Sequence, residues 1–128
     1  MLYLYNMSPE ARQDGVFKSL AAPVRRRILD DLKDNPLTTG ALCSRFAELD
    51  RCSVMQHLRV LEAADLVIVE RRGRERWNHL NPLPIHDIHE RWIGPHAARA
   101  VERLAGLKRA LERRPAPAIA KARLTHHG

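Results

Sequence analysis

Apolar residues recur at helical spacing in the middle of the chain, between residues 51 and 63. Val54, Leu58 and Leu61 fall at i, i+4 and i+7, so they line one buried stripe of a helix. Asp50 stands directly before this segment, where its side chain can act as the N-cap. The other faces of this helix carry polar and basic side chains, which are Arg51, Ser53, Gln56, His57 and Arg59.

A different pattern follows this helix. Residues 66–69 are apolar and rich in β-branched side chains, and residues 77–80 can form a second strand after a turn around Gly73. The sequence therefore predicts a β-hairpin. Its tip is strongly basic and carries Arg71, Arg72, Arg74 and Arg76.

Two shorter helices are expected upstream. Pro23 suits the first turn of a helix over residues 24–34, which Pro36 ends, and Leu20, Ile28, Leu29 and Leu32 supply its apolar contacts. Leu42 and Phe46 are spaced i, i+4 in a helix that begins at Thr38 or Thr39, and residues 47–50 form the turn before the central helix. The fold class that follows is mainly α with a small β-hairpin.

Apolar residues also recur at helical spacing near the C-terminus. Gly94 and Pro95 must break the pattern, because proline lacks an amide donor, so we expect helices over residues 83–93 and 96–113. The resulting stripe is a candidate dimer interface, although it could instead fold back on its own domain. Its residues are Ile85, Ile88, Trp92, Val101, Leu104 and Leu111.

The side chains of the central helix and the hairpin suit a nucleic-acid partner. Arginine, glutamine and serine hydrogen-bond base edges and backbone oxygens, and Gln56 is the best candidate for a bidentate adenine contact. Arg72, Arg74 and Arg76 would contact phosphates, since arginines on so short a ribbon repel one another without a polyanion. His57 can contact DNA or hydrogen-bond within the domain. An ordinary solvated helix and a solvated basic turn remain alternatives.

Composition agrees with a polyanionic partner. The chain has 128 residues, 45% of them apolar, which suits one domain, and it carries a net charge of +7. We expect a cytoplasmic protein, because there is no apolar run near 18 residues and no convincing signal segment. Phosphate loops, nucleophile elbows and zinc-protease spacings are absent from the sequence, so we expect no enzyme. A winged-helix module that docks on protein or RNA is the alternative function.

Over about residues 13–112, the chain resembles the ArsR/SmtB family of winged helix-turn-helix transcriptional repressors. The resemblance is carried by FKSLAAPVRRRILDDL, ALCSRF, SVMQHLRVLEAADLV and RRGRERWNHLNPLPI. It implies a homodimer that pairs through its terminal helices and binds an inverted repeat in double-stranded promoter DNA. We expect this domain to span residues 8–113, followed by a flexible basic tail over residues 114–128.

The family is known for metal sensing, but its metal-site motifs match this sequence poorly. The arsenic-type cysteines would fall at Thr38 and Gly40, and the second half of the other site at Ala100 and Arg103. Within the chain, His86, His89 and His96 are weak metal candidates, which no matched carboxylate or thiolate completes. We therefore expect that the chain binds no metal and no cofactor. We also expect it to belong to a subgroup of the family with a tryptophan-containing helix after the wing, which is the basic hairpin predicted over residues 66–80. The inducing ligand stays unknown.

Two cysteines are present, Cys43 and Cys52, and both are expected to be reduced thiols. Cys43 is expected in the core. Cys52 falls in the first turn of the central helix, where the helix dipole and Arg51 favour a reactive thiolate, so it is a possible redox thiol. The alternative is an unremarkable small residue at a helix start.

Overall fold

The computed structural model describes residues 6–94 and 97–113 of the chain. It divides into two compact units, Met1–Arg91 and Trp92–Gly128, and each is described here by itself. The expected tail over residues 114–128 and His96 lie outside the described residues.

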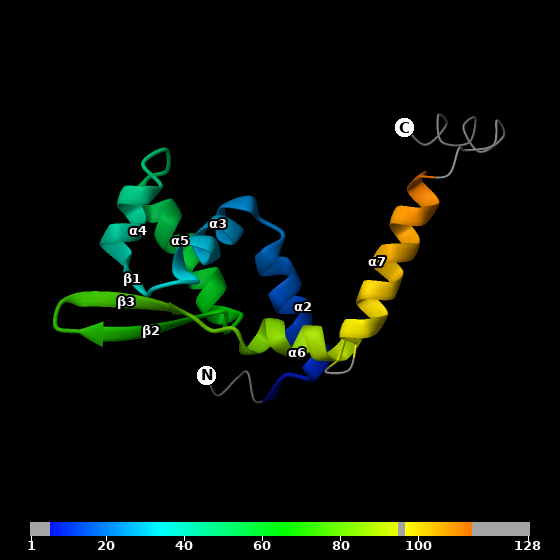
Figure 1. Cartoon of the computed structure of the whole chain (residues 1–128). Helices are drawn as coiled ribbons and strands as arrows, with labels where there is room; N and C mark the ends of the chain where they lie inside the picture. The colour runs from blue at the N-terminus through cyan, green and yellow to red at the C-terminus, as the bar shows by residue number, and fades with distance from the viewer. Residues whose placement is uncertain (1–5, 95–96, 114–128) are drawn as a thin grey trace, which may run out of the picture. The chain divides into compact units, whose positions relative to one another are not determined.

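The first unit is mainly helical, as its sequence predicts. Its helices are α2 (Pro9–Leu20), α3 (Pro23–Leu32), α4 (Thr39–Arg45), α5 (Arg51–Ala63) and α6 (Leu83–Trp92), whose last residue belongs to the second unit. Its strands are β1 (Leu37–Thr38), β2 (Val67–Arg72) and β3 (Glu75–Leu80) (Figure 1). The expected order of helices, turn, central helix and hairpin is confirmed.

Local signals fix where these helices begin. Ser8 caps α2 and Thr38 caps α4, since each side chain accepts a hydrogen bond from an amide three residues on, at 3.1 Å in both cases. Helix α3 has no side-chain cap, but Pro23 occupies its first turn. Proline is suited to that position because its missing amide would have no helical partner there.

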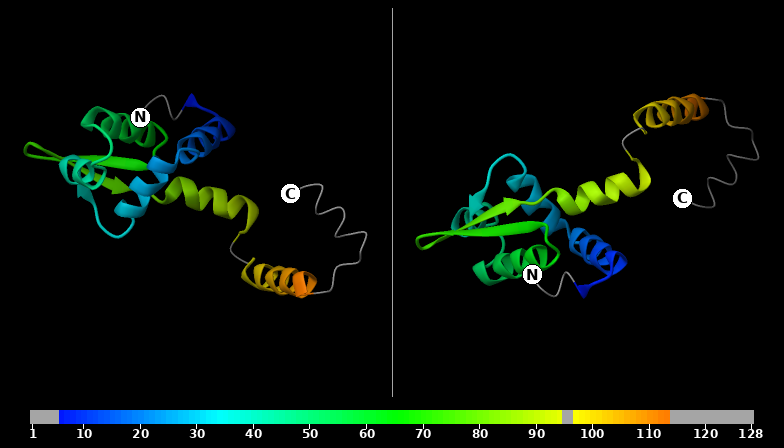
Figure 2. Two further views of the ribbon diagram at one scale, coloured as in Figure 1. Left: turned by 90° about the horizontal axis from the view of Figure 1, so that it is seen from above. Right: turned by 90° about the horizontal axis from the view of Figure 1, so that it is seen from below.

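The sheet has three antiparallel strands in the order β1-β3-β2. Strands β2 and β3 pair from Val67 with Leu80 to Arg72 with Glu75, so the hairpin is longer than the sequence predicts. Gly73 takes a φ of 60° in its turn, a conformation that glycine adopts without steric cost. The tip of this hairpin reaches past the helices in both views of Figure 2.

One apolar core holds the helices and the sheet of the first unit together. Phe46, Ile28 and Leu42 are among its largest fully buried side chains. Cys43, which was expected in the core, is half-buried and packs against it. Val54, Leu58 and Leu61 are buried, which confirms the stripe predicted for α5. The core residues are Val16, Ile28, Leu29, Leu32, Leu42, Phe46, Val54, Leu58, Leu61, Leu66 and Val67.

Helix α7 (Ala98–Arg113) lies in the second unit, and it confirms the helix predicted to follow the break at Gly94. None of its residues is buried. Gly94 itself has a φ of 69°, in the left-handed region that ends a helix.

Candidate nucleic-acid interface

Helices α4 and α5 and the turn between them form the helix-turn-helix. The turn is closed by an amide hydrogen bond of 2.9 Å from Leu49 to the carbonyl of Phe46. Asp50 then caps α5, because its carboxylate accepts from the amide of Ser53 at 2.6 Å. The hydrogen bonds that the Asp50 carboxylate accepts, above all from Ser53, hold the pKa of this carboxyl below its ordinary value.

The solvent-facing side of α5 carries the polar residues expected there. Gln56 and Arg59 are exposed, and with Cys52 they are spaced i, i+4 and i+7, so they share one face. Arg51 is exposed in the first turn, and Ser53 is half-buried beside it. This surface presents amide and guanidinium groups that can hydrogen-bond base edges or phosphates.

His57 takes the second of its two predicted roles, a hydrogen bond within the domain. The ring is half-buried, and its Nδ1 lies 3.2 Å from Nη1 of Arg25 on α3. Burial, and secondly the charge of Arg25, lower the pKa of His57 below its ordinary value. The ring therefore stays neutral at neutral pH.

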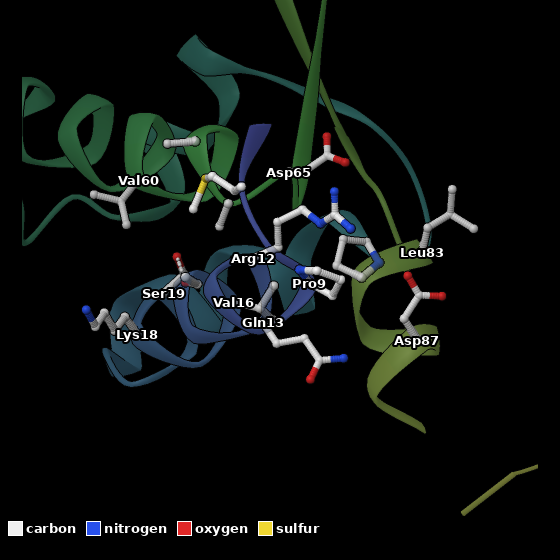
Figure 3. Close-up of a pocket in the computed structure, with 15 residues that line it drawn as sticks. Pro9, Arg12, Gln13, Val16, Lys18, Ser19, Val60, Asp65, Leu83 and Asp87 are labelled. Carbon is white, nitrogen blue, oxygen red and sulfur yellow. Dashed lines mark hydrogen bonds between the residues drawn. The ribbon is translucent and has the colours of Figure 1, made fainter. Parts of the chain in front are cut away.

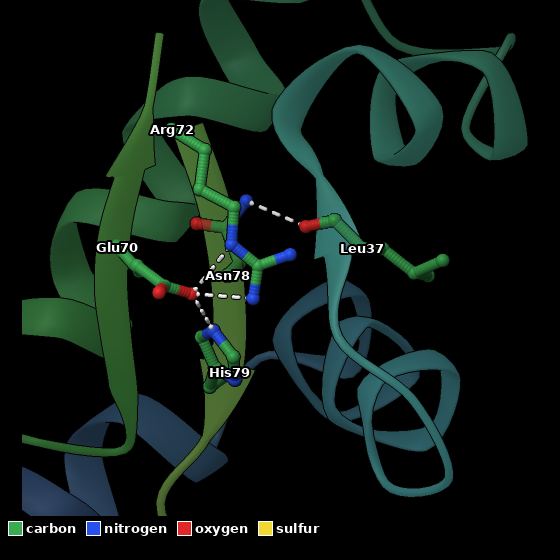
Figure 4. Close-up of polar contacts among 5 residues, drawn as sticks. All are labelled: Leu37, Glu70, Arg72, Asn78 and His79. Carbon is green, nitrogen blue, oxygen red and sulfur yellow. Dashed lines mark hydrogen bonds and ion pairs between the residues drawn. The ribbon is translucent and has the colours of Figure 1, made fainter. Parts of the chain in front are cut away.

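Part of the positive charge of the β2–β3 hairpin is neutralised by acidic side chains. Glu70 accepts from Arg72 at 2.8 Å and lies 3.0 Å from Nε2 of His79 (Figure 4). Arg72 and then His79 lower the pKa of the Glu70 carboxyl. The repulsion expected among the hairpin arginines is thus partly relieved by acids that the sequence reasoning did not pair with them.

The other arginines of the hairpin differ in their surroundings. Arg76 reaches Glu62 of α5 at 3.5 Å, which ties the hairpin to the central helix. Arg71 and Arg74 are exposed, and within residues 6–94 and 97–113 neither pairs with an acid. Arg74 directly follows Gly73 in the turn, so it places an exposed positive charge at the tip of the hairpin.

Asn78 on β3 attaches the hairpin to β1 and to the start of α4. The side chain is 1% exposed, and its Nδ2 donates to the carbonyl of Leu37 at 3.2 Å (Figure 4) and to Thr39 Oγ1 at 3.1 Å. These bonds hold β1 and the first residue of α4 against β3. The sequence pattern missed β1, since two residues give no strand periodicity.

The predicted dimer-interface residues differ in exposure. In the first unit Ile85 is 39% exposed, whereas Ile88 is partly buried and packs against the core of its own domain. In the second unit the four predicted residues are each at least 50% exposed, with Leu104 at 63%. These four are Trp92, Val101, Leu104 and Leu111.

Two of the three weak metal candidates, His86 and His89, lie on α6, and the third, His96, lies outside the described residues. The rings of His86 and His89 stack on α6 with centroids 6.4 Å apart, and both lie near Glu90. Among the described residues, no group of three or more histidine, cysteine, aspartate or glutamate side chains could hold a metal ion. Cys52 is exposed and Cys43 is half-buried, and both are free thiols; a redox role of Cys52 stays a prediction.

A hollow of about 690 Å³ lies in the first unit between α2, α5 and α6 (Figure 3). Val16, Val60 and Leu83 contribute apolar surface, and Arg12 and Asp87 contribute charge. None of the residues predicted to contact DNA lines this hollow. It is therefore separate from the polar face of α5.

Comparison with known proteins identifies the helix-turn-helix independently of the geometry. A family of helix-turn-helix domains matches residues 20–70. The chain is similar to the transcriptional repressor SdpR of Bacillus subtilis strain 168, with 32% identity over 58% of this chain and 81% of that protein. It is also similar to the HTH-type transcriptional regulator YuzN of the same organism, with 36% identity over 63% of this chain and 95% of YuzN.

The fold likewise matches solved structures. A crystal structure of an ArsR family transcriptional regulator superposes with a TM-score of 0.59 and 28% identity, covering 85% of this chain and 98% of that one. These relatives are transcriptional regulators rather than enzymes. In the part of the chain that the structure describes, no helix has both the length and the apolar character that crossing a membrane requires.

Proposed function

The chain belongs to the ArsR family of helix-turn-helix transcriptional regulators, and from that premise we propose that it is a sequence-specific repressor. In this proposal it acts as a homodimer on an inverted-repeat operator in double-stranded promoter DNA. The subgroup has a tryptophan-containing helix after the wing and no intact metal-site motif.

The exposed polar face of α5 is the observation that carries this proposal. Gln56 points its amide away from the buried stripe and suits a bidentate contact to adenine. Arg59 shares that face, and Arg51 and Ser53 lie in the first turn, where recognition helices contact base edges and backbone.

The wing supplies affinity without sequence information. Arg72 and Arg76 lie on the strands at either side of the turn and Arg74 lies in the turn, so these arginines can reach the phosphates that border the groove. Arg74 contributes a whole charge, whereas Arg72 and Arg76 already neutralise Glu70 and Glu62. We therefore assign Arg74 the larger share of the salt-dependent binding.

A second copy of the chain would cover the exposed apolar residues of α6 and α7. The proposed interface comprises Ile85, Ile88, Trp92, Val101, Leu104 and Leu111, with Ile88 also serving the core of its own domain. In a two-fold dimer, the two α5 helices enter successive major grooves about 34–36 Å apart. The operator half-sites would then lie about one helical turn apart.

Repression would result from occupancy of the promoter. SdpR, to which the chain is similar, is a transcriptional repressor, and this similarity supports repression over activation. A ligand that released the DNA would have to bind one dimer geometry more tightly than another, because equal affinity shifts no equilibrium.

The proposal is tested by fluorescence anisotropy of the purified protein at about 0.15 M salt, an ionic strength at which nonspecific phosphate binding is partly screened. The probes are the duplex upstream of its own gene and a scrambled duplex of equal length. A preference of about a thousandfold or more for the native duplex is expected of specific binding. Equal, salt-sensitive binding to this and to duplexes selected from random sequence would overturn sequence reading. Absence of all binding would favour a module that docks on protein or RNA.

A further inference from the structure

We propose that Arg25 is a positioning residue for DNA reading, which fixes α5 against the C-terminal end of α2 through His57. This inference rests on the proposed function, since the position of α5 matters here only if that helix reads DNA. Arg25 was not among the residues singled out by the sequence, because nothing in its local pattern distinguishes it from Arg26 and Arg27.

One guanidinium group joins three helices. The backbone of Arg25 belongs to α3, its Nε donates to the carbonyl of Ser19 at 2.7 Å, and its Nη2 donates to the carbonyl of Lys18 at 3.2 Å. Both carbonyls are in the last turn of α2, and that of Lys18 also accepts from the amide of Ala21 at 3.3 Å. The remaining Nη1 lies 3.2 Å from His57 Nδ1 on α5.

The chemistry of this pair fixes which atom donates. An arginine side chain has five N–H donors, no acceptor and a charge that it keeps at any physiological pH. His57 Nδ1 must therefore accept, which requires a neutral ring with its proton on Nε2. The lowered pKa of His57 agrees with that state. A protonated ring would place two cations 3.2 Å apart and remove the acceptor.

The pair acts where α5 most needs a directional contact. The buried stripe of Val54, Leu58 and Leu61 holds the helix by apolar contacts, which are non-directional. His57 directly follows Gln56, so its hydrogen bond sets the rotation of α5 beside the proposed base-reading side chain. Recognition side chains must be held to within about 0.5 Å to keep their hydrogen bonds, and a guanidinium fork can supply that restraint.

A simpler role for Arg25 would be to cap α2, and Arg26 separates the two roles. Arg26 is the next residue on α3, and its Nη1 donates to the carbonyl of Leu20 at 2.6 Å, also in the last turn of α2. Both arginines thus place a positive charge at the C-terminus of α2, which is the negative end of its helix dipole. Only Arg25 also bonds α5, as far as the described residues show. Arg26→Met is therefore the matched control for Arg25→Met.

The experiment compares Arg25→Met and Arg26→Met with the unmodified protein, by anisotropy on the preferred duplex and on a scrambled duplex. Arg25→Met should lower the ratio of the two affinities at least about tenfold, the loss of roughly one base contact, whereas Arg26→Met should leave that ratio within about threefold. Thermal unfolding of each variant shows whether it is folded at the assay temperature. A cap alone would lower both melting temperatures and spare both ratios.

A second pair of variants tests the acceptor at residue 57 without touching Arg25. Asn presents Oδ1 at about the place of Nδ1, so His57→Asn should keep most of the preference, whereas His57→Leu should lose it as Arg25→Met does. If the unmodified protein shows no preference for any duplex, the proposed function fails. If it does show one, and the Arg25 and Arg26 variants keep it equally, the positioning role is overturned. Equal behaviour of the two His57 variants would also overturn it.

Discussion

Among single residues, Asp65 has the least expected backbone conformation. Its φ is 63°, and it is the one non-glycine residue with a positive φ in the described part of the chain. It directly follows the C-cap of α5, where the amide of Leu66 bonds the carbonyl of Leu61 at 2.9 Å and that of Asp65 bonds Glu62 at 3.0 Å. This is the Schellman pattern of helix termination, whose left-handed residue is usually glycine.

We expect Asp65→Gly to raise the free energy of unfolding by about 0.5–1 kcal/mol, because glycine adopts a positive φ without the Cβ clash. Urea unfolding followed by circular dichroism measures the change. Asp14→Gly is the control, since Asp14 lies inside α2 and glycine weakens a helix interior by about 0.5–1 kcal/mol. A destabilised Asp65→Gly protein would mean that the carboxylate, not the backbone, dominates at this residue.

His57 gives stability a pH dependence of predictable sign. Below its ordinary pKa of about 6.5 an unfolded His57 gains a proton, whereas the folded ring, whose pKa is lowered, stays neutral until a lower pH. The unfolded state binds more protons in that interval. The free energy of unfolding should therefore be full above pH about 6.5 and fall as pH is lowered towards the folded pKa.

Unfolding in urea between pH 8 and pH 5, about the range in which histidine titrates, measures this slope. His57→Asn cannot titrate, so its stability should fall less steeply over the same interval. The other histidines are common to both proteins and cancel in the difference. Equal slopes would show that His57 has the same pKa in the folded and unfolded chains.

At the scale of elements, helices with strong periodicity could be predicted from sequence. The stripe of Val54, Leu58 and Leu61 located α5, and the break at Gly94 and Pro95 separated α6 from α7. Strand β1 could not be predicted, since it exists by pairing with β3, in which Leu37 lies opposite Asn78, a residue 41 positions away. The bounds of α2 were also not assigned, because its buried residues, Val16 and Ser19, give too sparse an apolar pattern.

The candidate site shows the same division between local and long-range information. Residue type and spacing predicted the exposed face with Gln56 and Arg59, which depends only on helical geometry. The partners of His57 and Arg76 depend on tertiary contacts with Arg25 and Glu62, so no local pattern could show them. Sequence therefore predicted which residue types could meet DNA, but not which of them were already paired within the domain.

Substitutions in α5 and in the wing should have different effects on DNA binding. Gln56→Ala should weaken binding at one or two base pairs of the operator by about 1–3 kcal/mol and relax specificity there. Arg74→Ala should weaken all duplexes alike and lower the slope of log affinity against log salt by about 0.9. Anisotropy titrations over a range of salt concentrations measure both effects.

Arg76→Ala is the control within the wing, because Arg76 is paired with Glu62 at 3.5 Å. Its removal should change the salt slope less than removal of Arg74. If Gln56→Ala lost affinity equally for operator and scrambled DNA, as Arg74→Ala is expected to do, that result would contradict the division between base reading and phosphate contact.

At the scale of the whole molecule, the apolar face of α7 should decide the oligomeric state. Val101, Leu104 and Leu111 are each at least 50% exposed in the single chain, and a second copy would bury them. Leu104→Asp should shift the protein from dimer towards monomer and reduce operator binding, since an unpaired carboxylate is costly to bury in an interface.

Light scattering after size-exclusion chromatography measures the mass of each variant. Arg109→Asp is the control, because a residue five positions beyond Leu104 in α7 lies on a different face of the helix. A dimer that survives Leu104→Asp and dissociates with Arg109→Asp would place the interface on the opposite face.

Within the wing, Arg72 lies over the ring of Trp77, and this contact gives the protein an optical reporter of its own. The Arg72 guanidinium lies 4.9 Å from the ring centre of Trp77, one of two tryptophans in the chain. A phosphate that draws Arg72 away from Glu70 would also draw it from the indole, because one side chain makes both contacts. The part of the tryptophan emission that is lost in a Trp77→Phe variant should therefore change when DNA binds, without any attached dye.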